Sequence, residues 1–242
     1  MTKMLIRVTT VAMSLQYLIK GQPRFMSDVF EVLCVSSGQK NELNEVAIYE
    51  GIEVKQIEMT RQITPVKDLI SLIKLMRLFK KEKPAIVHTH TPKAGILGML
   101  AANLVGVPIR LHTVAGMPLM ESKGIKRSIL EVVEKLTYAC AMKVYPNSKG
   151  LEQFILEHKF AHAEKIKVIA NGSSNGIDTF YFDPNQFSKE RKQVLRYDLG
   201  IQEDDFVFIF VGRLVGDKGI NELVKAFKSL SFEEGLRERP GL

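Results

Sequence analysis

The amino-acid sequence predicts an α/β protein in which helices cover both faces of a doubly wound, parallel β-sheet. Three observations lead to this fold class. Short apolar runs alternate with segments of helical length along most of the chain. These runs are continuously apolar, as expected for strands that are buried on both faces. Near the C-terminal end, a loop-rich segment is followed by a new strand-and-helix pattern. Because parallel crossovers are right-handed, we expect a complete Rossmann-like domain, followed by the first βα unit of a second one.

The individual elements follow from the apolar pattern and its period. Strands are expected at residues 5–9, 30–35, 52–57, 85–89, 108–113, 143–145, 167–169 and 206–211. Helices are expected at residues 14–25, 41–50, 65–81, 94–105, 126–141 and 149–158. Ligands of such sheets bind at the carboxyl ends of the strands, so candidate functional residues are sought there.

A loop-rich stretch, ANGSSNGIDTFYFDPNQF, separates the two patterns. Its Gly, Asn, Asp and Ser residues predict a linker. We assign residues 1–185 to the N-terminal domain and residues 186–242 to the linker and the start of a second domain. The second pattern opens with SKERKQVLRYDLGI, a predicted helix that ends at Gly200. A whole domain needs on the order of 100 residues or more, so we expect the second domain to be truncated in this chain.

The charge balance is basic, with a net charge of +7 and an isoelectric point near 9.3. Such an excess favours polyanionic partners, which include nucleic acid, phosphorylated small molecules and anionic lipid surfaces. Nucleic-acid binding on a basic face would need interleaved aromatic side chains. The sequence has no Trp, and its Phe residues lie mostly in apolar or acidic contexts. We therefore expect no nucleic-acid partner.

Cys34 and Cys140 lie in apolar runs and lack the spacing of metal ligands. This pattern indicates reduced thiols in the core of a cytoplasmic protein and argues against a zinc site. The N-terminal stretch MTKMLIRVTTVAMSLQYLIKG is interrupted by Arg7 and no small-residue cleavage site follows. We interpret it as a strand and a helix, not as a signal peptide. No run reaches the roughly 18 apolar residues of a membrane span.

Two predicted helices are both basic and apolar. The first, LISLIKLMRLFKKEK, presents Lys74, Arg77, Lys80, Lys81 and Lys83. The second, ESKGIKRSILEVVEKL, opens with Lys123, Lys126 and Arg127. An ordinary surface helix with solvated lysines is the simpler interpretation. The alternative is peripheral contact with an anionic membrane, at the inner face of the plasma membrane.

The loop VGRLVGDKG, which follows the strand expected at residues 206–211, places Gly212, Arg213 and Lys218 together. Glycines after a strand allow backbone N–H groups to approach an anion. Arg213 can grip a phosphate through two hydrogen bonds, and Lys218 can add a point charge. The spacing matches neither a P-loop nor a dinucleotide fingerprint. A diphosphate clamp and a glycine turn with exposed cations both remain open at this point.

Three histidines end predicted strands. His88 and His90, in IVHTHTPKAGILG, alternate along a strand, so both imidazoles are expected on the same side. No nearby carboxylate or cysteine completes a metal site, and hydrogen-bonded histidines at a strand tip are the simpler interpretation. Lys93 in the next turn could face an anion. His112, in RLHTVAGMP, could donate a hydrogen bond to a sugar or phosphate, or could simply pack at the strand end.

Together these segments resemble the retaining glycosyltransferases of family 4, which have the two-domain GT-B fold. The motifs HTHTPKAGILGMLAANLVGVPIRLHTVAG, VEKLTYACAMKVYPNS, NGSSNGID and VGRLVGDKG occur in the order of that family. The resemblance covers nearly all of the chain. It is strongest to the branch that synthesises capsules, exopolysaccharides and O-antigens.

The resemblance implies roles for residues of the donor site. Arg213 and Lys218, with Gly212, are similar to the residues that neutralise the donor diphosphate and the departing nucleoside diphosphate. His112 is similar to the histidine that bonds donor-sugar hydroxyls near the reacting carbon. Relatives have a glycine-rich loop near the donor phosphates where this chain has TTVAMSL, which contains no glycine. Ser14 is the candidate that substitutes for it, through its hydroxyl or the N–H groups of the helix it opens.

We assign His88, His90 and Lys93 to the acceptor and sugar side, in an N-terminal acceptor-side domain. The second domain is then the one that binds the nucleotide sugar. Family members generally need no metal, because Arg and Lys stabilise the charge. We therefore expect no cofactor besides the nucleoside-diphosphate sugar, which is the donor substrate.

The implied reaction is the transfer of a hexose, with retention, from a nucleoside-diphosphate sugar to a saccharide acceptor linked to polyprenyl diphosphate. The paired glutamates of the family lie downstream of the diphosphate clamp, where this chain has ended. We therefore expect the chain by itself to bind donor weakly and to be inactive. The alternative is a non-catalytic module, derived from such an enzyme, that docks on a membrane or a partner.

Overall fold

The computed structural model of the protein describes residues 3–174, 176–212 and 214–233. The chain forms two compact units, Met1–Ile177 and Asp178–Leu242, and each is described by itself. The domain boundary expected after residue 185 falls inside the second unit. Candidate residues of the first unit are therefore considered within that unit alone.

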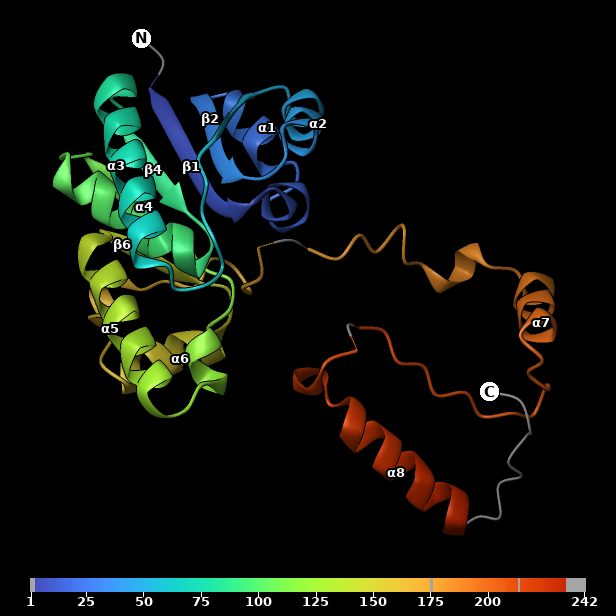
Figure 1. Ribbon diagram of the computed structural model, residues 1–242. Coiled ribbons are helices and arrows are strands. Elements are labelled where there is room, and N and C mark those ends of the chain that lie inside the picture. The colour runs from blue at the N-terminus through green and yellow to red at the C-terminus, as the bar shows by residue number, and fades with distance from the viewer. Residues whose placement is uncertain (1–2, 175, 213, 234–242) are drawn as a thin grey trace. The chain divides into compact units, whose positions relative to one another are not determined.

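A six-stranded parallel sheet forms the centre of the first unit (Figure 1). Its strands are β1 (Met4–Val11), β2 (Glu31–Ser37), β3 (Glu53–Gln56), β4 (Ile86–Thr89), β5 (Ile109–Val114) and β6 (Lys143–Pro146). They lie in the order β3-β2-β1-β4-β5-β6, and every neighbouring pair is parallel. This order confirms the predicted doubly wound α/β fold. The direction of winding reverses between β1 and β4, which makes their carboxyl ends the place where ligands bind in such sheets.

Helices connect the strands, as the alternation in the sequence predicts. The helices of the first unit are η1 (Ser14–Leu18), α1 (Gln22–Ser27), α2 (Lys40–Glu50), α3 (Pro65–Glu82), α4 (Pro92–Leu104), η2 (Pro118–Glu121), α5 (Gly124–Cys140), α6 (Lys149–Glu157) and η3 (Ala163–Lys165). Proline occupies the first turn of α3 and of α4, where its missing N–H needs no partner. The hydroxyl of Ser148 accepts a hydrogen bond from the backbone N–H of Leu151 and so caps α6.

Two apolar layers pack against the two faces of the sheet. On one face, α4 packs between α3 and α5 (Figure 1), and Leu75, Phe79 and Met99 join the buried strand residues Val8 and Val87. On the other face, η1 and α2 supply the apolar residues of a second cluster. That cluster includes Leu5, Leu15, Ile19, Cys34, Leu43 and Val46. Successive strand residues point to opposite faces, so neighbouring residues of one strand serve different layers.

Two expected elements differ in the structure. The helix expected at residues 14–25 is divided into η1 and α1, because Gly21 adopts a left-handed conformation (φ 75°) between them. Residues 167–169, where a strand is expected, are not assigned as a strand, and the residue before them, Ile166, forms a single bridge with Val144. The chain bends away soon afterwards at Ala170, which has a positive φ of 50°.

The second unit contains η4 (Pro184–Gln186), α7 (Lys189–Asp198), η5 (Gly216–Lys218) and α8 (Ile220–Glu233). The hydroxyl of Ser188 caps α7 by accepting from the N–H of Arg191 at 3.2 Å. Residues 206–211 are not assigned as a strand, which differs from the expectation. A strand is defined by hydrogen bonds to a neighbouring strand, and residues 206–211 pair with no other strand in the described part of the chain. Phe206 and Ile209 are each 83% exposed, so apolar side chains that would be covered in a sheet face solvent.

Candidate functional site

The carboxyl edge of the sheet gathers most residues that the sequence singled out in the first unit. Ser14 follows β1, His88 lies in β4 and His90 directly after it, and His112 lies in β5. Lys93 is in the first turn of α4, which follows β4. Parallel strands end at one edge, so these residues share a region. Their side chains nevertheless have separate environments.

His90 is held by a buried arginine that the sequence analysis did not select. Arg7 Nε and Nη2 lie 3.2 and 2.9 Å from His90 Nε2, and both residues are buried. Because arginine is only a donor, His90 Nε2 accepts, and its neutral ring carries the proton on Nδ1. Arg7 Nη2 also donates to Gln22 Oε1 at 2.8 Å. Among the described residues, neither Arg7 Nη1 nor His90 Nδ1 has a hydrogen-bond partner.

The charge of Arg7 is retained despite its burial. Burial lowers the pKa of Arg7 to about 10, while the field of Glu50 is one of the factors that raise it. The guanidinium therefore stays protonated at neutral pH. The carboxylate of Glu50 is itself engaged, because it accepts from the backbone N–H groups of Gly21 at 2.6 Å and Arg24 at 3.0 Å. The direct partners of Arg7 are thus the neutral groups of His90 and Gln22.

His88 and His90 lie on the same side of the sheet, as the alternation predicts. Their ring centroids are 4.1 Å apart, and His88 Nε2 lies 2.8 Å from the hydroxyl of Thr113. The pKa values of both imidazoles lie well below the usual value, first because of burial and then because of neighbouring charge, including that of Arg7. Both rings are therefore neutral hydrogen-bonding groups at physiological pH.

His112 faces the opposite layer. Its Nδ1 lies 2.7 Å from the hydroxyl of Thr89, and its side chain is buried beneath α4. A Cβ atom at Gly95 would lie only 2.6 Å from His112 Cε1, so the glycine permits the close approach of α4 to this ring. Burial lowers the pKa of His112 to about 4. The three histidines therefore form two groups, separated by the sheet.

Lys93 is engaged in an ion pair between helices. Its Nζ lies 2.5 Å from Asp68 Oδ2, and the two side chains are only 11% and 19% exposed. Asp68 also accepts hydrogen bonds from the backbone and hydroxyl of Thr64. This pair joins α4 to α3, and a role of Lys93 toward an anion stays a prediction.

The turn after β1 uses hydroxyl groups in place of glycines. The hydroxyls of Thr10 and Thr91 are 2.6 Å apart, and the backbone N–H of Thr10 donates to Thr91 Oγ1 at 2.9 Å. Thr10 Oγ1 also accepts from the backbone N–H of Ala94 at 3.2 Å, in the first turn of α4. These contacts join the end of β1 to the start of α4, at the point where the sheet reverses. Ser14 begins η1 just beyond it, and its proposed approach to donor phosphates stays a prediction.

The candidate diphosphate residues belong to the second unit. Gly212 and Lys218 are exposed, and Lys218 ends the short helix η5 just before α8. Gly219 between the two helices has a left-handed conformation (φ 70°). Arg213 lies outside the described residues. The clamp formed by Arg213 and Lys218 therefore stays a prediction.

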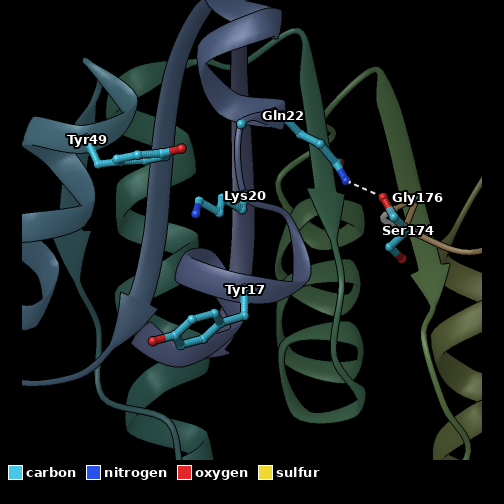
Figure 2. Close-up of a pocket in the computed structure, with 7 residues that line it drawn as sticks. Tyr17, Lys20, Gln22, Tyr49, Ser174 and Gly176 are labelled. Carbon is cyan, nitrogen blue, oxygen red and sulfur yellow. Dashed lines mark hydrogen bonds between the residues drawn. The ribbon is translucent and has the colours of Figure 1, made fainter. Parts of the chain in front are cut away.

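The first unit contains an open cavity of about 510 Å³ on the other side of β1 from α4 (Figure 2). Its lining residues are Tyr17, Lys20, Gly21, Gln22, Tyr49, Ser174 and Gly176. Gln22 Nε2 donates to the backbone oxygen of Ser174 at 2.7 Å, which ties the start of α1 to the segment after β6. A smaller cavity of about 340 Å³ shares Tyr17, Lys20 and Tyr49 with it. The sequence analysis named none of these residues as functional.

Within the described ranges, no group of three or more His, Cys, Asp or Glu side chains could hold a metal ion. None of the helices in the described part of the chain combines the length and apolarity that a bilayer crossing requires. Cys34 and Cys140 are both buried and free, as expected for core thiols.

Comparison with known families matches residues 11–168 to the model described as "Glycosyl transferase 4-like". The matched range begins at the end of β1 and includes all three histidines of the carboxyl edge. It covers more than half of the 242 residues.

Two curated proteins are similar over long segments. The capsular polysaccharide biosynthesis glycosyltransferase CapM of Staphylococcus aureus is 38% identical over 224 residues, which cover 91% of this chain and 56% of CapM. The UDP-Gal:alpha-D-GlcNAc-diphosphoundecaprenol alpha-1,3-galactosyltransferase of Escherichia coli is 36% identical over 159 residues, or 64% of this chain and 39% of that enzyme. The chain thus spans about half, or less, of the length of these relatives.

Solved structures show the same architecture. A glycosyltransferase from Rickettsia africae ESF-5 matches with a TM-score of 0.67 at 19% identity, over 96% of this chain and 58% of that one. Anabaena Alr3699/HepE in complex with UDP matches with a TM-score of 0.66 at 18% identity, over 94% and 57%. At these identities the matches concern the fold alone.

Proposed function

The chain belongs to the glycosyl transferase 4-like family, and from this premise we propose that the protein transfers a hexose from a nucleoside-diphosphate sugar to a saccharide acceptor. The process served is the synthesis of a cell-surface polysaccharide. The observation that carries this proposal is the 38% identity, over 91% of the chain, to a capsular polysaccharide glycosyltransferase. The identity extends across both units, so it includes the segment with Arg213 and Lys218.

The acceptor is a saccharide linked to polyprenyl diphosphate. Support comes from the Escherichia coli relative, which by its name acts on an N-acetylglucosamine joined to diphosphoundecaprenol. That relative uses UDP-galactose, and UDP and UDP-glucose are bound in structures of Anabaena HepE. A UDP-hexose is therefore the first donor to examine.

The chemistry of the transfer needs charge stabilisation at the leaving group. The bond between the anomeric carbon and the diphosphate breaks, and a bond to an acceptor oxygen forms. The departing nucleoside diphosphate takes the electron pair of the broken bond and so develops negative charge, and its oxygen accepts the proton that the acceptor hydroxyl loses. Arg213 and Lys218 are the residues that stabilise this charge, since preplaced cations stabilise a developing charge more than the ground state. Because these cations stabilise the charge, the reaction proceeds without a metal. The anomeric configuration is retained, as the resemblance to the retaining glycosyltransferases implies.

A lipid-linked acceptor is anchored in the bilayer, so we expect the protein that uses it to contact the membrane. Val66, Leu69 and Ile70 at the start of α3 are between 49% and 74% exposed, and Ile125 and Ile129 at the start of α5 are 82% and 43% exposed. Each helix follows a parallel strand, so both begin at the carboxyl edge of the sheet. Exposed apolar side chains at this edge can enter a lipid interface.

Basic side chains lie beside these apolar residues. Lys67 belongs to the same turn of α3, and Lys123 and Lys126 flank the start of α5; all three are exposed. Lysines near an anionic bilayer each contribute about 1 kcal/mol of attraction. We place the protein at the cytoplasmic face of the plasma membrane, where nucleotide sugars and the lipid-linked acceptor meet.

The test is a transfer assay with the full-length protein, a panel of radiolabelled UDP-hexoses and polyprenyl-diphosphate-linked N-acetylglucosamine. Transfer of label into the lipid fraction is the expected result. The anomeric configuration of the product, read by NMR, tests retention, and the same assay with a chelator tests metal independence. Binding to anionic vesicles without transfer from any donor would contradict the proposal and favour the non-catalytic docking module.

A further inference from the structure

The cavity beside β1 has walls suited to a saccharide. Tyr17 and Tyr49 are 66% and 48% exposed and border the cavity of about 510 Å³ (Figure 2). This volume is in the range of small-molecule sites. Aromatic rings offer an apolar face to the C–H side of a sugar ring, while the phenol oxygens offer hydrogen bonds. Two tyrosines on one cavity thus provide both kinds of contact.

The cavity is lined by one cation, and further cations lie near it. Lys20 lines it, with its ammonium 5.1 Å from the ring centroid of Tyr49, and Arg24 lies 4.8 Å from the same ring. In the portion of the chain that the structure describes, Lys20 forms no ion pair with a carboxylate. A further cation, Arg7, does not line the cavity but is hydrogen-bonded to it indirectly, because its Nη2 donates to the lining residue Gln22.

Arg7 is a buried cation without a directly bonded carboxylate. Its side chain is 1% exposed, and its hydrogen bonds in the described structure go to the neutral groups of His90 and Gln22. A charge removed from water is costly unless an opposite charge lies near. The carboxylate that acts on Arg7 through its charge, that of Glu50, already accepts two backbone N–H groups. Part of the charge of Arg7 therefore remains available to stabilise an anion in the cavity.

Gln22 connects Arg7 to the cavity, and two hydrogen bonds fix the orientation of its amide group. Its Oε1 accepts from Arg7, and its Nε2 donates to the backbone oxygen of Ser174 (Figure 2). An amide group has two N–H bonds, and one of them remains after the contact with Ser174. The hydroxyl of Ser174, another lining residue, is buried and has no hydrogen-bond partner in the described structure. Two residues that line the cavity, Gln22 and Ser174, thus each have a donor group for which the described structure shows no hydrogen-bond partner.

We propose that the cavity formed by Tyr17, Lys20, Gln22, Tyr49 and Ser174 binds a phosphate-bearing saccharide, with Arg7 as the positioning residue behind Gln22. The tyrosines contact the sugar, and Lys20, Gln22 and Ser174 contact the phosphate. At the point where the sheet reverses, Thr10 and Thr91 are hydrogen-bonded to each other, whereas the open cavity lies beside β1. The assignment of the ligand to the acceptor rests on the proposed function, whereas its phosphate-and-sugar chemistry does not.

Two sources of this chemistry can be distinguished by binding. Glucose 1-phosphate and N-acetylglucosamine 1-phosphate represent the head of a lipid-linked acceptor, and UDP-glucose represents the donor. Unphosphorylated glucose measures the sugar contact alone. Isothermal titration of the full-length protein gives the affinity of each, and we expect a sugar 1-phosphate to bind at least about tenfold more tightly than glucose, since hydrogen bonds to a charged group contribute about 1.5–3 kcal/mol.

The decisive variant is Gln22→Glu. A carboxylate at this position would pair with Arg7 and neutralise it, so the protein should remain folded with unchanged or higher thermal stability. Affinity for the sugar 1-phosphates should fall by about tenfold or more, and Lys20→Met should reduce it similarly. Gln62→Glu, which adds the same charge at an exposed site before α3, should leave the affinity unchanged.

Unchanged affinity in both Gln22→Glu and Lys20→Met would overturn the proposal, as would equal binding of glucose and its phosphate. Binding of UDP-glucose that is lost in the same two variants, without binding of the sugar 1-phosphates, would support the site and assign it to the donor. None of these results depends on transfer. A protein that binds sugar phosphates here but transfers no sugar would refute the proposed function and leave the site standing.

Discussion

Arg7 and His90, 83 residues apart in the sequence, are joined by hydrogen bonds of 3.2 and 2.9 Å from one buried guanidinium to one imidazole nitrogen. The arrangement fixes the chemistry of His90. A nitrogen that accepts from arginine carries no proton, and a second charge on the imidazole would face the guanidinium directly.

The first prediction concerns the tautomer of His90. At pH 7 its ring should be neutral, with the proton on Nδ1, because Nε2 accepts from Arg7. A long-range ¹H–¹⁵N spectrum of the ¹⁵N-labelled protein, assigned with a His90→Gln variant, reports the two ring nitrogens separately. A protonated Nε2 on this ring would contradict the Arg7 contact.

The second prediction is that His112 makes the folded protein less stable in acid. Burial lowers its pKa from 6.5 to about 4, so the unfolded chain binds the proton more tightly than the folded one. The contribution is therefore complete above pH 6.5 and is lost as the pH falls from 6.5 toward 4. The difference between these pKa values corresponds to about 3 kcal/mol.

Denaturant unfolding of the wild type and of His112→Gln at several pH values between 7 and 4 measures this contribution. The free energy of unfolding should fall less steeply in the variant. The matched control is His162→Gln, at an exposed position, which should keep the slope of the wild type. Identical slopes for wild type and His112→Gln would show that the imidazole protonates in the folded state without difficulty.

The third prediction tests how closely α4 approaches His112. A methyl group at Gly95 would lie 2.6 Å from His112 Cε1, while the Thr89 hydroxyl holds the ring in place. Gly95→Ala should destabilise the protein by about 1–3 kcal/mol through overpacking, although alanine is the better helix former. Gly150 is the control position, because the nearest atom to a methyl group there, Ser148 Oγ, would lie 4.0 Å away.

Thermal or denaturant unfolding compares the two alanine variants. Gly150→Ala, in the first turn of α6, should be neutral or slightly more stable than the wild type. If Gly95→Ala were equally stable, the close packing of α4 on His112 would be refuted.

The fourth prediction concerns the membrane. Replacing Leu69 and Ile70, which are 57% and 49% exposed on α3, by glutamine should leave the fold intact and weaken binding to anionic vesicles. Each buried aliphatic side chain contributes about 1.5–3 kcal/mol, so the double variant should partition at least about tenfold less into the lipid. Vesicle flotation measures the partition.

The matched control for the vesicle experiment is Ile48→Gln. Ile48 is 83% exposed on α2, on the layer opposite to α3. Its replacement should not change vesicle binding. A loss equal to that of the α3 variant would mean that apolar exposure in general, and not the start of α3, carries the interaction.

Much of the fold was predictable because burial on both faces leaves a simple trace in a sequence. Continuous apolar runs located β1, β2, β4 and β5, and helical spacing located α2 to α6. Local backbone geometry was harder to predict. The helix expected at residues 14–25 is divided because Gly21 is left-handed, and a glycine within a helical pattern does not by itself reveal that conformation.

The arrangement of candidate-site residues was predictable only for residues that lie close together at the end of one strand. Alternation placed His88 and His90 on one side, and the structure confirms this arrangement. Arg7 was noticed only as an interruption of an apolar run, because its partners His90 and Gln22 are brought to it by the tertiary fold. A charged residue within a buried strand was the available signal. The segment 206–211 has a strand-like composition, but a strand also needs a neighbour to pair with.

The most direct test of the account is the rate of hexose transfer by the full-length protein after removal of the proposed diphosphate clamp. Arg213→Ala should lower the rate by roughly two to three powers of ten, by analogy with the loss of one oxyanion donor, and Arg213→Ala with Lys218→Ala should lower it further. Lys192→Ala, at an exposed position on α7, should keep the wild-type rate. A double variant that transfers sugar as fast as the wild type would contradict the account.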